Sequence, residues 1–228
     1  MRLASGIQLE RTTEWTAVTF ERPRPVLSSA PVGGGDALAA RIVNLWVDGP
    51  GAGAACADPA GTFARLAASR GWSGETVGLM TGVPPGRLAL VRLARDPAGW
   101  TVLATAGTRN AHHAGEPAPA PAPAAAAAGT INVIAITGQG LTGAARAEAI
   151  GLVAEAKASI LTDLDVWPAS GEGQATGTGT DATAVVCGDA NDVSYTGHHT
   201  DSGVELARAV REAIARSLAL GPAATPGG

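Results

Sequence analysis

Threonine and glycine alternate along residues 175–181 (ATGTGTD), which places hydroxyl groups on a backbone that can approach a ligand closely. The backbone N–H groups of such a loop could stabilise an oxyanion, and a threonine hydroxyl could act as a nucleophile. Thr178, Thr180 and Asp181 are therefore candidate site residues, with Asp181 at the mouth of a predicted strand. A surface loop in which threonine reflects β propensity is the alternative interpretation.

A second glycine-rich segment covers residues 28–36 (SSAPVGGGD). Glycines let the backbone approach a ligand and offer N–H groups to an anion or a carbonyl oxygen. The segment lacks the GK[ST] ending of a phosphate-binding P-loop. It predicts either a ligand cradle or a tight turn before a short helix, and the residues concerned are Ser28, Ser29, Gly33, Gly34 and Gly35.

The four histidines form two adjacent pairs, His112-His113 and His198-His199. Neighbouring side chains on a strand point to opposite faces, so a pair of this kind rarely binds one metal ion. The sequence has no HExxH motif and no cysteine cluster, so we expect no protein-bound metal. One histidine of each pair could act as a general base or contact a ligand.

Glu155 and three asparagines are further candidates. Glu155 lies beside the apolar stripe of a predicted helix, where a carboxylate can be a tuned acid or base, although a solvated helix edge is commoner. Asn44, Asn110 and Asn132 lie near the ends of predicted strands. Their side chains could hydrogen-bond amide groups of a substrate, or they could complete turns.

The elements that must position these residues are clearest in the C-terminal half. Residues 131–137 and 181–187 predict two buried strands. Thr142 can cap a helix that reaches Leu161, with apolar residues spaced by three and four. Ser202 and Glu205 form a capping-box pattern for a second helix that ends near Leu220.

The N-terminal half predicts strands at residues 15–20, 42–47, 77–80, 88–93 and 100–105. The last two flank a type I turn sequence at residues 96–99 and predict a hairpin. Asp58-Pro59 opens a helix that Gly71 ends. Strands that alternate with helices predict an α/β fold, a single mixed-sheet domain over residues 1–228 with flanking helices. Residues 115–129, rich in proline and alanine, predict an exposed inserted linker.

Composition and charge exclude several classes of function. The formal net charge is −4 and the pI is about 5.5, so neither a nucleic-acid partner nor binding to an anionic membrane surface is expected. The sequence has no apolar run long enough to span a bilayer, and residues 1–15 have no apolar core typical of a signal peptide. Cys56 and Cys187 lie far apart and fit a reducing compartment, so we expect a cytoplasmic protein.

Eight segments, taken in order, resemble the adenosylcobinamide amidohydrolase (CbiZ) family, and the GTGTD and HHT stretches are the most specific. They are RPRPVLSSAPVGGG (22–35), RIVNLWVD (41–48), VGLMTG (77–82), TAGTRN (105–110), GTINVI (129–134), EAKASILTDLDV (155–166), ATGTGTDATAVV (175–186) and YTGHHTDSGVELARAV (195–210).

The resemblance implies a hydrolase of corrinoid salvage. It would cut the amide between the aminopropanol arm and the corrin propionate of adenosylcobinamide, giving adenosylcobyric acid and 1-amino-2-propanol. The corrinoid is then the small-molecule partner and carries its own cobalt, so the protein requires no cofactor. The sequence carries no signal for an oligomeric state.

Amide hydrolysis needs a nucleophile or activated water, a base, oxyanion stabilisation and an acid for the leaving amine. For the reaction that the resemblance implies, our hypothesis uses the backbone of residues 177–181 as the oxyanion hole. Asp181 or Glu155 would position a water, and His199 would move protons. In the competing version Thr180 is a covalent nucleophile. Residues 28–35 would hold the corrin amides, with Asn44, Asn110, Asn132, Thr178 and His198 as further substrate contacts.

Three other functions stay open at this level. A non-catalytic corrinoid-binding module would share the same polar residues without turnover. An amidase for a different small amide would use the same chemistry on another substrate. A metal-dependent hydrolase would lose activity on chelation.

Overall fold

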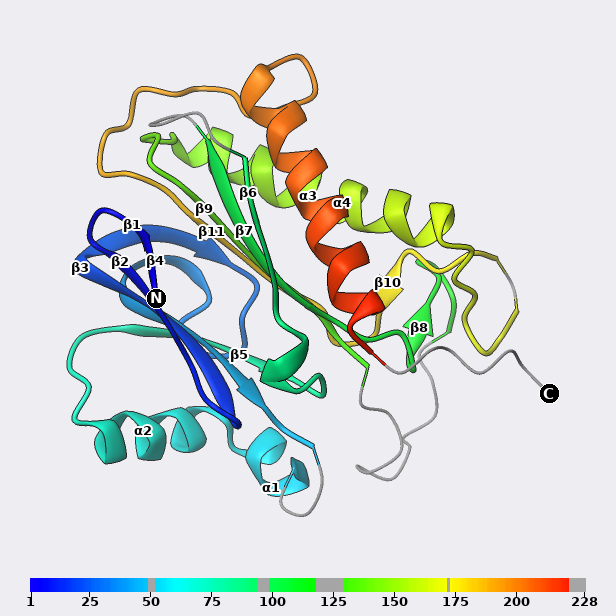
Figure 1. The fold of residues 1–228 in the computed structure, drawn as a ribbon, viewed down its shortest axis with the longest axis horizontal. Helices are drawn as coiled ribbons and strands as arrows, with labels where there is room; N and C mark the ends of the chain where they lie inside the picture. Colours follow the sequence, from blue (N-terminus) through cyan, green and yellow to red (C-terminus); the bar gives the residue numbers. More distant parts are fainter. Residues whose placement is uncertain (49–51, 94–98, 118–128, 172, 222–228) are drawn as a thin grey trace.

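A computed structural model describes residues 1–48, 52–93, 99–117, 129–171 and 173–221 (Figure 1). Within these residues one nine-stranded mixed sheet, together with helices, confirms the predicted α/β class. Along its main path the sheet runs β1 (Arg2–Ala4), β2 (Ile7–Arg11), β3 (Trp15–Ser28), β11 (Ala182–Val186), β9 (Ile131–Thr137), β7 (Trp100–Ala106) and β6 (Ala89–Arg92).

The long strand β3 lets the sheet branch. Its first half pairs with β2, its second half pairs with β11, and β4 (Gly35–Trp46) follows it antiparallel along most of its length. β5 (Thr76–Thr81) then adds to β4 in parallel. β9 and β11 are also parallel and are joined through a helix, which is a βαβ unit. A separate two-stranded sheet pairs β8 (Ala111–His112) with β10 (Gly177–Thr178).

The three helices predicted from the sequence are confirmed, and two of them begin at the predicted cap. Asp58 caps α2 (Pro59–Arg70) and Gly71 ends it in the left-handed conformation, while Thr142 caps α3 (Gly143–Asp163). The third is α4 (Asp201–Ala219), whereas α1 (Ala52–Ala57) and the 3-10 turn η1 (Pro85–Arg87) were not predicted.

The predicted capping box of α4 is wrong. The N-cap is Thr200, whose side chain accepts a hydrogen bond from the backbone N–H of Gly203. Ser202 lies inside the helix, where its hydroxyl instead accepts hydrogen bonds from the side chains of Trp100 and Gln139. A tertiary contact with β7 thus takes the hydroxyl that local spacing assigns to the helix end.

Most predicted strands are confirmed, including the antiparallel β6–β7 hairpin. Its turn residues 96–98, and residues 118–128 of the predicted insertion, lie outside the described residues. The expected short helix after residue 35 is wrong, because the chain enters β4 directly. Strands β1, β2, β8 and β10 were not predicted, since each is short and lacks an extended apolar pattern.

Alternate residues of the central strands face two different cores. In β9, Ile131, Val133 and Ala135 pack under α3 and α4, whereas Ile134 and Ile136 face the opposite way. This second core also contains apolar side chains of β1 to β5, so the sheet curls back upon itself. Figure 1 shows α3 and α4 on one face of the sheet and α1 and α2 across the molecule. The curl brings β5 beside β9, where the Asn132 side chain donates to the Met80 carbonyl at 2.8 Å.

Candidate active site

Asp181 organises a tight turn, residues 177–181, which contains β10 and leads into β11. Its Oδ1 accepts hydrogen bonds from the Ile131 N–H at 2.8 Å and from the Thr178 hydroxyl. Its Oδ2 accepts from the Thr178 N–H at 2.9 Å and from Lys157 Nζ on α3 at 2.5 Å. A carboxylate has about four lone-pair sites, so all of them are filled within the protein. Asp181 therefore has no oxygen left with which to position a water.

The Lys157–Asp181 ion pair is largely shielded from solvent. The side chains are 16% and 10% exposed respectively. Each charge of such a shielded pair needs the other, because removing one would leave the other without a partner in a poorly solvated site. Lys157 was missed from the sequence, where it is an ordinary lysine two residues beyond Glu155. Only the packing of α3 against the turn gives it this partner.

Gly177 is required by the ion pair, because a Cβ there would lie 2.7 Å from Asp181 Oδ2 and 3.1 Å from Lys157 Nζ. We predict that Gly177→Ala lowers the free energy of unfolding by about 1–3 kcal/mol through this crowding. Urea unfolding followed by circular dichroism measures the change. Gly151→Ala is the matched control, since a Cβ at this α3 position meets open space. It should raise stability by about 0.5–1 kcal/mol. Equal behaviour of the two variants would contradict the prediction.

Thr180 occupies the exposed tip of the turn. Its hydroxyl shares a 2.8 Å hydrogen bond with the hydroxyl of buried Thr130. Among the described residues, no hydrogen bond uses the backbone N–H of Thr180. The tip thus presents a hydroxyl and an N–H donor together, which is the pairing required of a nucleophile beside an oxyanion site.

The 28–35 loop joins the same end of β11. Ser29 donates its backbone N–H to the Thr183 carbonyl at 3.0 Å and accepts the Thr183 N–H on its hydroxyl, also at 3.0 Å. The Ser28 hydroxyl donates to the same carbonyl at 2.8 Å. The structure therefore brings the two glycine-rich segments of the sequence together, with Thr183 only two residues beyond Asp181.

The glycines of this loop serve close backbone packing. A Cβ at Gly33 would lie 2.6 Å from the Thr76 carbonyl oxygen, and one at Gly34 would lie 2.3 Å from that of Ala30. Gly33 and Gly35 also have positive φ angles of 60° and 85°. The loop geometry explains these glycines without a ligand, so a role for them in substrate binding stays a prediction.

Of the three predicted asparagines, two are buried in the second core. Asn44 and Asn132 are 3% and 1% exposed, and they hydrogen-bond each other at 2.8 Å. Asn44 also donates to the Thr105 hydroxyl, and Asn132 accepts the Ala182 N–H. These amides fix the curl of the sheet below the turn, because buried polar groups need such partners.

Asn110 lies beside the turn. Its Nδ2 is 4.0 Å from the position that a Cβ at Gly179 would occupy. Its Oδ1 is buried against Gly129 and has no hydrogen-bond partner among the described residues. Asn110 is therefore a predicted substrate contact that lies beside the tip of the turn.

The second histidine pair lies elsewhere, at the beginning of α4. His198 Nε2 contacts Glu155 Oε2 at 2.5 Å in a pair whose side chains are 74% and 64% exposed. The His199 ring packs edge-on against Tyr195, with centroids 5.5 Å apart. Glu155 and Lys157 are two residues apart on α3 and so project in different directions. The contacts of His198 and Glu155 thus lie on a different side of α3 from Asp181, and nothing described joins His199 to the turn.

His112, from the other histidine pair, lies against the turn instead. It stands opposite Gly177 in the β8–β10 pair. Its Nδ1 is 3.1 Å from Glu116 Oε2, and this glutamate side chain is only 6% exposed. Glu116 also accepts the Ser170 hydroxyl at 2.5 Å and the His113 N–H at 3.1 Å. The Ser170 bond is the main cause of a lowered pKa of Glu116, which favours its carboxylate form.

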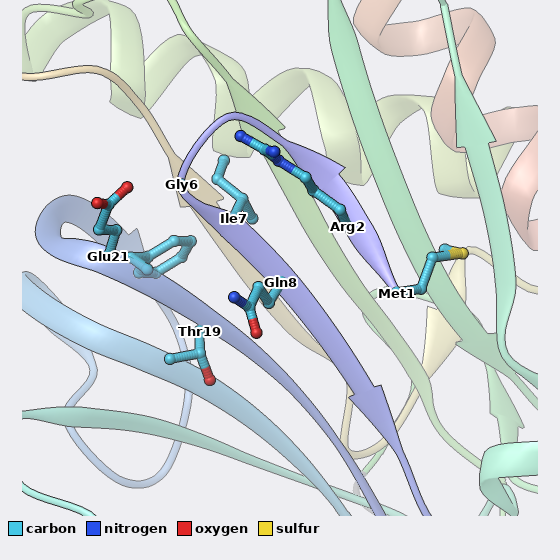
Figure 2. A pocket seen from close by; sticks show the side chains of 8 residues that line it. Met1, Arg2, Gly6, Ile7, Gln8, Thr19 and Glu21 are labelled. Carbon is cyan, nitrogen blue, oxygen red and sulfur yellow. The ribbon is translucent and has the colours of Figure 1, made fainter.

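A separate open groove is lined by β1, β2 and β3, and by no predicted site residue (Figure 2). Arg2, Gln8 and Glu21 are among its polar side chains, and Gly6 turns the chain above it with a φ of 68°.

In the described part of the chain, no three metal-binding side chains gather to form a metal site. No helix among those residues is apolar and long enough to cross a bilayer.

Comparison with known proteins identifies the family. A protein of Methanocaldococcus jannaschii, described as uncharacterized, is 43% identical over 89 residues, which are 39% of this chain and 35% of that protein. The chain thus matches about a third of that relative's length. A crystal structure of a Pyrococcus horikoshii OT3 protein aligns with 93% of this chain and 79% of its own, at 13% identity and a TM-score of 0.48. The family of adenosylcobinamide amidohydrolases (CbiZ) matches residues 2–226. Because this match spans nearly the whole sequence, the chain belongs to the adenosylcobinamide amidohydrolase family.

Proposed function

We propose that the protein hydrolyses the aminopropanol amide of adenosylcobinamide, releasing adenosylcobyric acid and 1-amino-2-propanol. The family match over residues 2–226 is the observation that carries this proposal. The 177–181 turn supports it with a hydroxyl and with an N–H donor that has no partner among the described residues, which can serve as nucleophile and oxyanion donor. The cobalt belongs to the substrate, and the protein supplies no cofactor of its own.

Within this proposal Thr180 is the nucleophile. A water mechanism would need Asp181 or Glu155 to hold the water, but the oxygens of Asp181 are filled and Glu155 is paired with exposed His198. The Thr180 hydroxyl attacks the amide carbonyl carbon, and the Thr180 N–H and the Asn110 amide stabilise the oxyanion. Expulsion of the amine leaves an ester on Thr180, and water then hydrolyses this ester to the carboxylic acid.

Asp181 acts here by positioning the turn. Its bonds to the Thr178 N–H and to Lys157 hold the backbone that carries Thr180. A preorganised N–H donor stabilises a transition state without reorganising during the reaction, so a rigid anchor favours catalysis. The 28–35 loop, joined to Thr183, forms the neighbouring wall against which the corrin amides bind.

Incubation of the purified protein with adenosylcobinamide tests the proposal. We expect adenosylcobyric acid and free 1-amino-2-propanol in equal amounts, followed by liquid chromatography and mass spectrometry. Thr180→Ala protein is the matched control for hydrolysis by contaminants. Binding of cobinamide without either product would instead support a corrinoid-binding module. Turnover of other small amides, with cobinamide unchanged, would support a different amidase.

A further inference from the structure

We infer that His112, oriented by Glu116, is the catalytic group that moves protons at Thr180. This inference rests on the proposed amide hydrolysis and replaces the role that sequence reasoning gives to His199. Three observations carry it: the position of His112 in the small sheet, the carboxylate on one of its ring nitrogens, and the shielding of that carboxylate.

The register of the β8–β10 pair gives the position of His112. Residues that lie opposite each other in an antiparallel pair project their side chains to the same face. His112 lies opposite Gly177, and a Cβ at Gly177 would point at Asp181 Oδ2, 2.7 Å away. The His112 ring therefore leaves the small sheet on the face that carries Asp181 and the turn. His113, the next residue, bonds the Gln174 carbonyl through its Nδ1 at 2.7 Å and packs against Gly173.

The contact with Glu116 gives the ring the form that a base needs. The carboxylate 3.1 Å from Nδ1 favours the tautomer that carries its proton on Nδ1, which leaves the lone pair on Nε2 to accept a proton. Glu116 is fixed in turn by the Ser170 hydroxyl and the His113 N–H. A nucleophile, a base and a carboxylate that orients the base form the arrangement required of covalent amide hydrolysis. His198 also has a carboxylate partner, but both groups of that pair are mostly exposed.

In this scheme His112 Nε2 carries the proton through both halves of the reaction. His112 Nε2 accepts the Thr180 hydroxyl proton while the oxygen bonds to the amide carbon. When the carbon–nitrogen bond breaks, the same nitrogen gives that proton to the leaving amine. Water then attacks the ester, its proton passes to Nε2, and release of the acid returns a proton to Thr180. The net reaction is amide plus water to carboxylic acid plus amine.

Two variants of His112 separate a catalytic role from a structural one. In His112→Asn the amide nitrogen takes the place of Nδ1, so the contact with Glu116 is kept while Nε2 is lost. His112→Gln places an amide nitrogen near Nε2 that cannot accept a proton. We expect kcat on adenosylcobinamide to fall about 10²–10⁴-fold in both variants, with KM and the melting temperature nearly unchanged. His113→Asn is the matched control and should keep wild-type kcat, because its amide can keep the contact that His113 Nδ1 makes with the Gln174 carbonyl.

A double-mutant cycle tests Glu116 as a positioning residue. Glu116→Gln alone should lower kcat at least about tenfold, whereas in the His112→Asn background it should have little further effect, because groups that act as one unit are non-additive. Normal kcat in folded His112→Asn and His112→Gln would overturn the inference. A large loss of kcat in a folded His199→Asn variant would return the role to His199. If the kcat losses of the two single variants multiply in the double variant, the role of Glu116 is overturned. A wild-type protein without turnover would overturn the proposed function, and this assignment with it.

Discussion

Replacing Asp181 with alanine should lower the free energy of unfolding by about 3–5 kcal/mol, because it leaves the shielded Lys157 ammonium group without its partner. It also removes the acceptor of the Ile131 and Thr178 N–H groups. Lys157→Met should have a smaller effect, since three donors still hold the Asp181 carboxylate. Urea unfolding, followed by far-ultraviolet circular dichroism, gives the free energies of unfolding of the wild type and of both variants.

An exposed ion pair provides the control for this stability prediction. Arg216 and Glu212 pair on the surface of α4 with side chains 57% and 43% exposed. Glu212→Ala should therefore change the free energy of unfolding by no more than about 1 kcal/mol. A loss in Asp181→Ala as small as that in Glu212→Ala would show that the shielded pair does not stabilise the turn.

Removal of the Thr180 hydroxyl should have the largest effect on activity. Thr180→Ala should lower kcat on adenosylcobinamide about 10³-fold or more, because the covalent route is lost while the backbone N–H donor remains. Thr180→Ser keeps a hydroxyl on the same Cβ and should keep measurable turnover. Product formation measured under substrate saturation compares the two variants with the wild type.

The Thr180 prediction has a clear structural control. Thr130→Val removes the hydroxyl that bonds Thr180 in the resting enzyme, without removing the nucleophile. We expect its kcat to stay within about tenfold of wild type, since this bond orients the hydroxyl and takes no part in bond breaking. Equal kcat in folded Thr180→Ala and Thr180→Ser would rule out Thr180 as the nucleophile and favour attack by an activated water.

Local chemistry in the sequence determined much of the fold. Asp58, Gly71 and Thr142 act at helix ends because a cap needs only residues within one turn. The five apolar residues among the seven of β9 mark a strand buried on both faces. Ser202 shows the limit of this reasoning, because a partner 102 residues away in β7 takes the hydroxyl that local spacing assigns to a cap.

The sequence by itself also determined the family resemblance and marked residues 177–181 as a candidate site, since both depend on residue order alone. Only the tertiary structure decided which partners these residues have. Asp181 meets Lys157 24 residues away, and His112 meets Gly177 across a two-residue strand with no periodic pattern. The two histidine pairs look alike in the sequence. Strand pairing and helix packing, which depend on contacts between distant segments, decided that His112 lies at the turn and His199 does not.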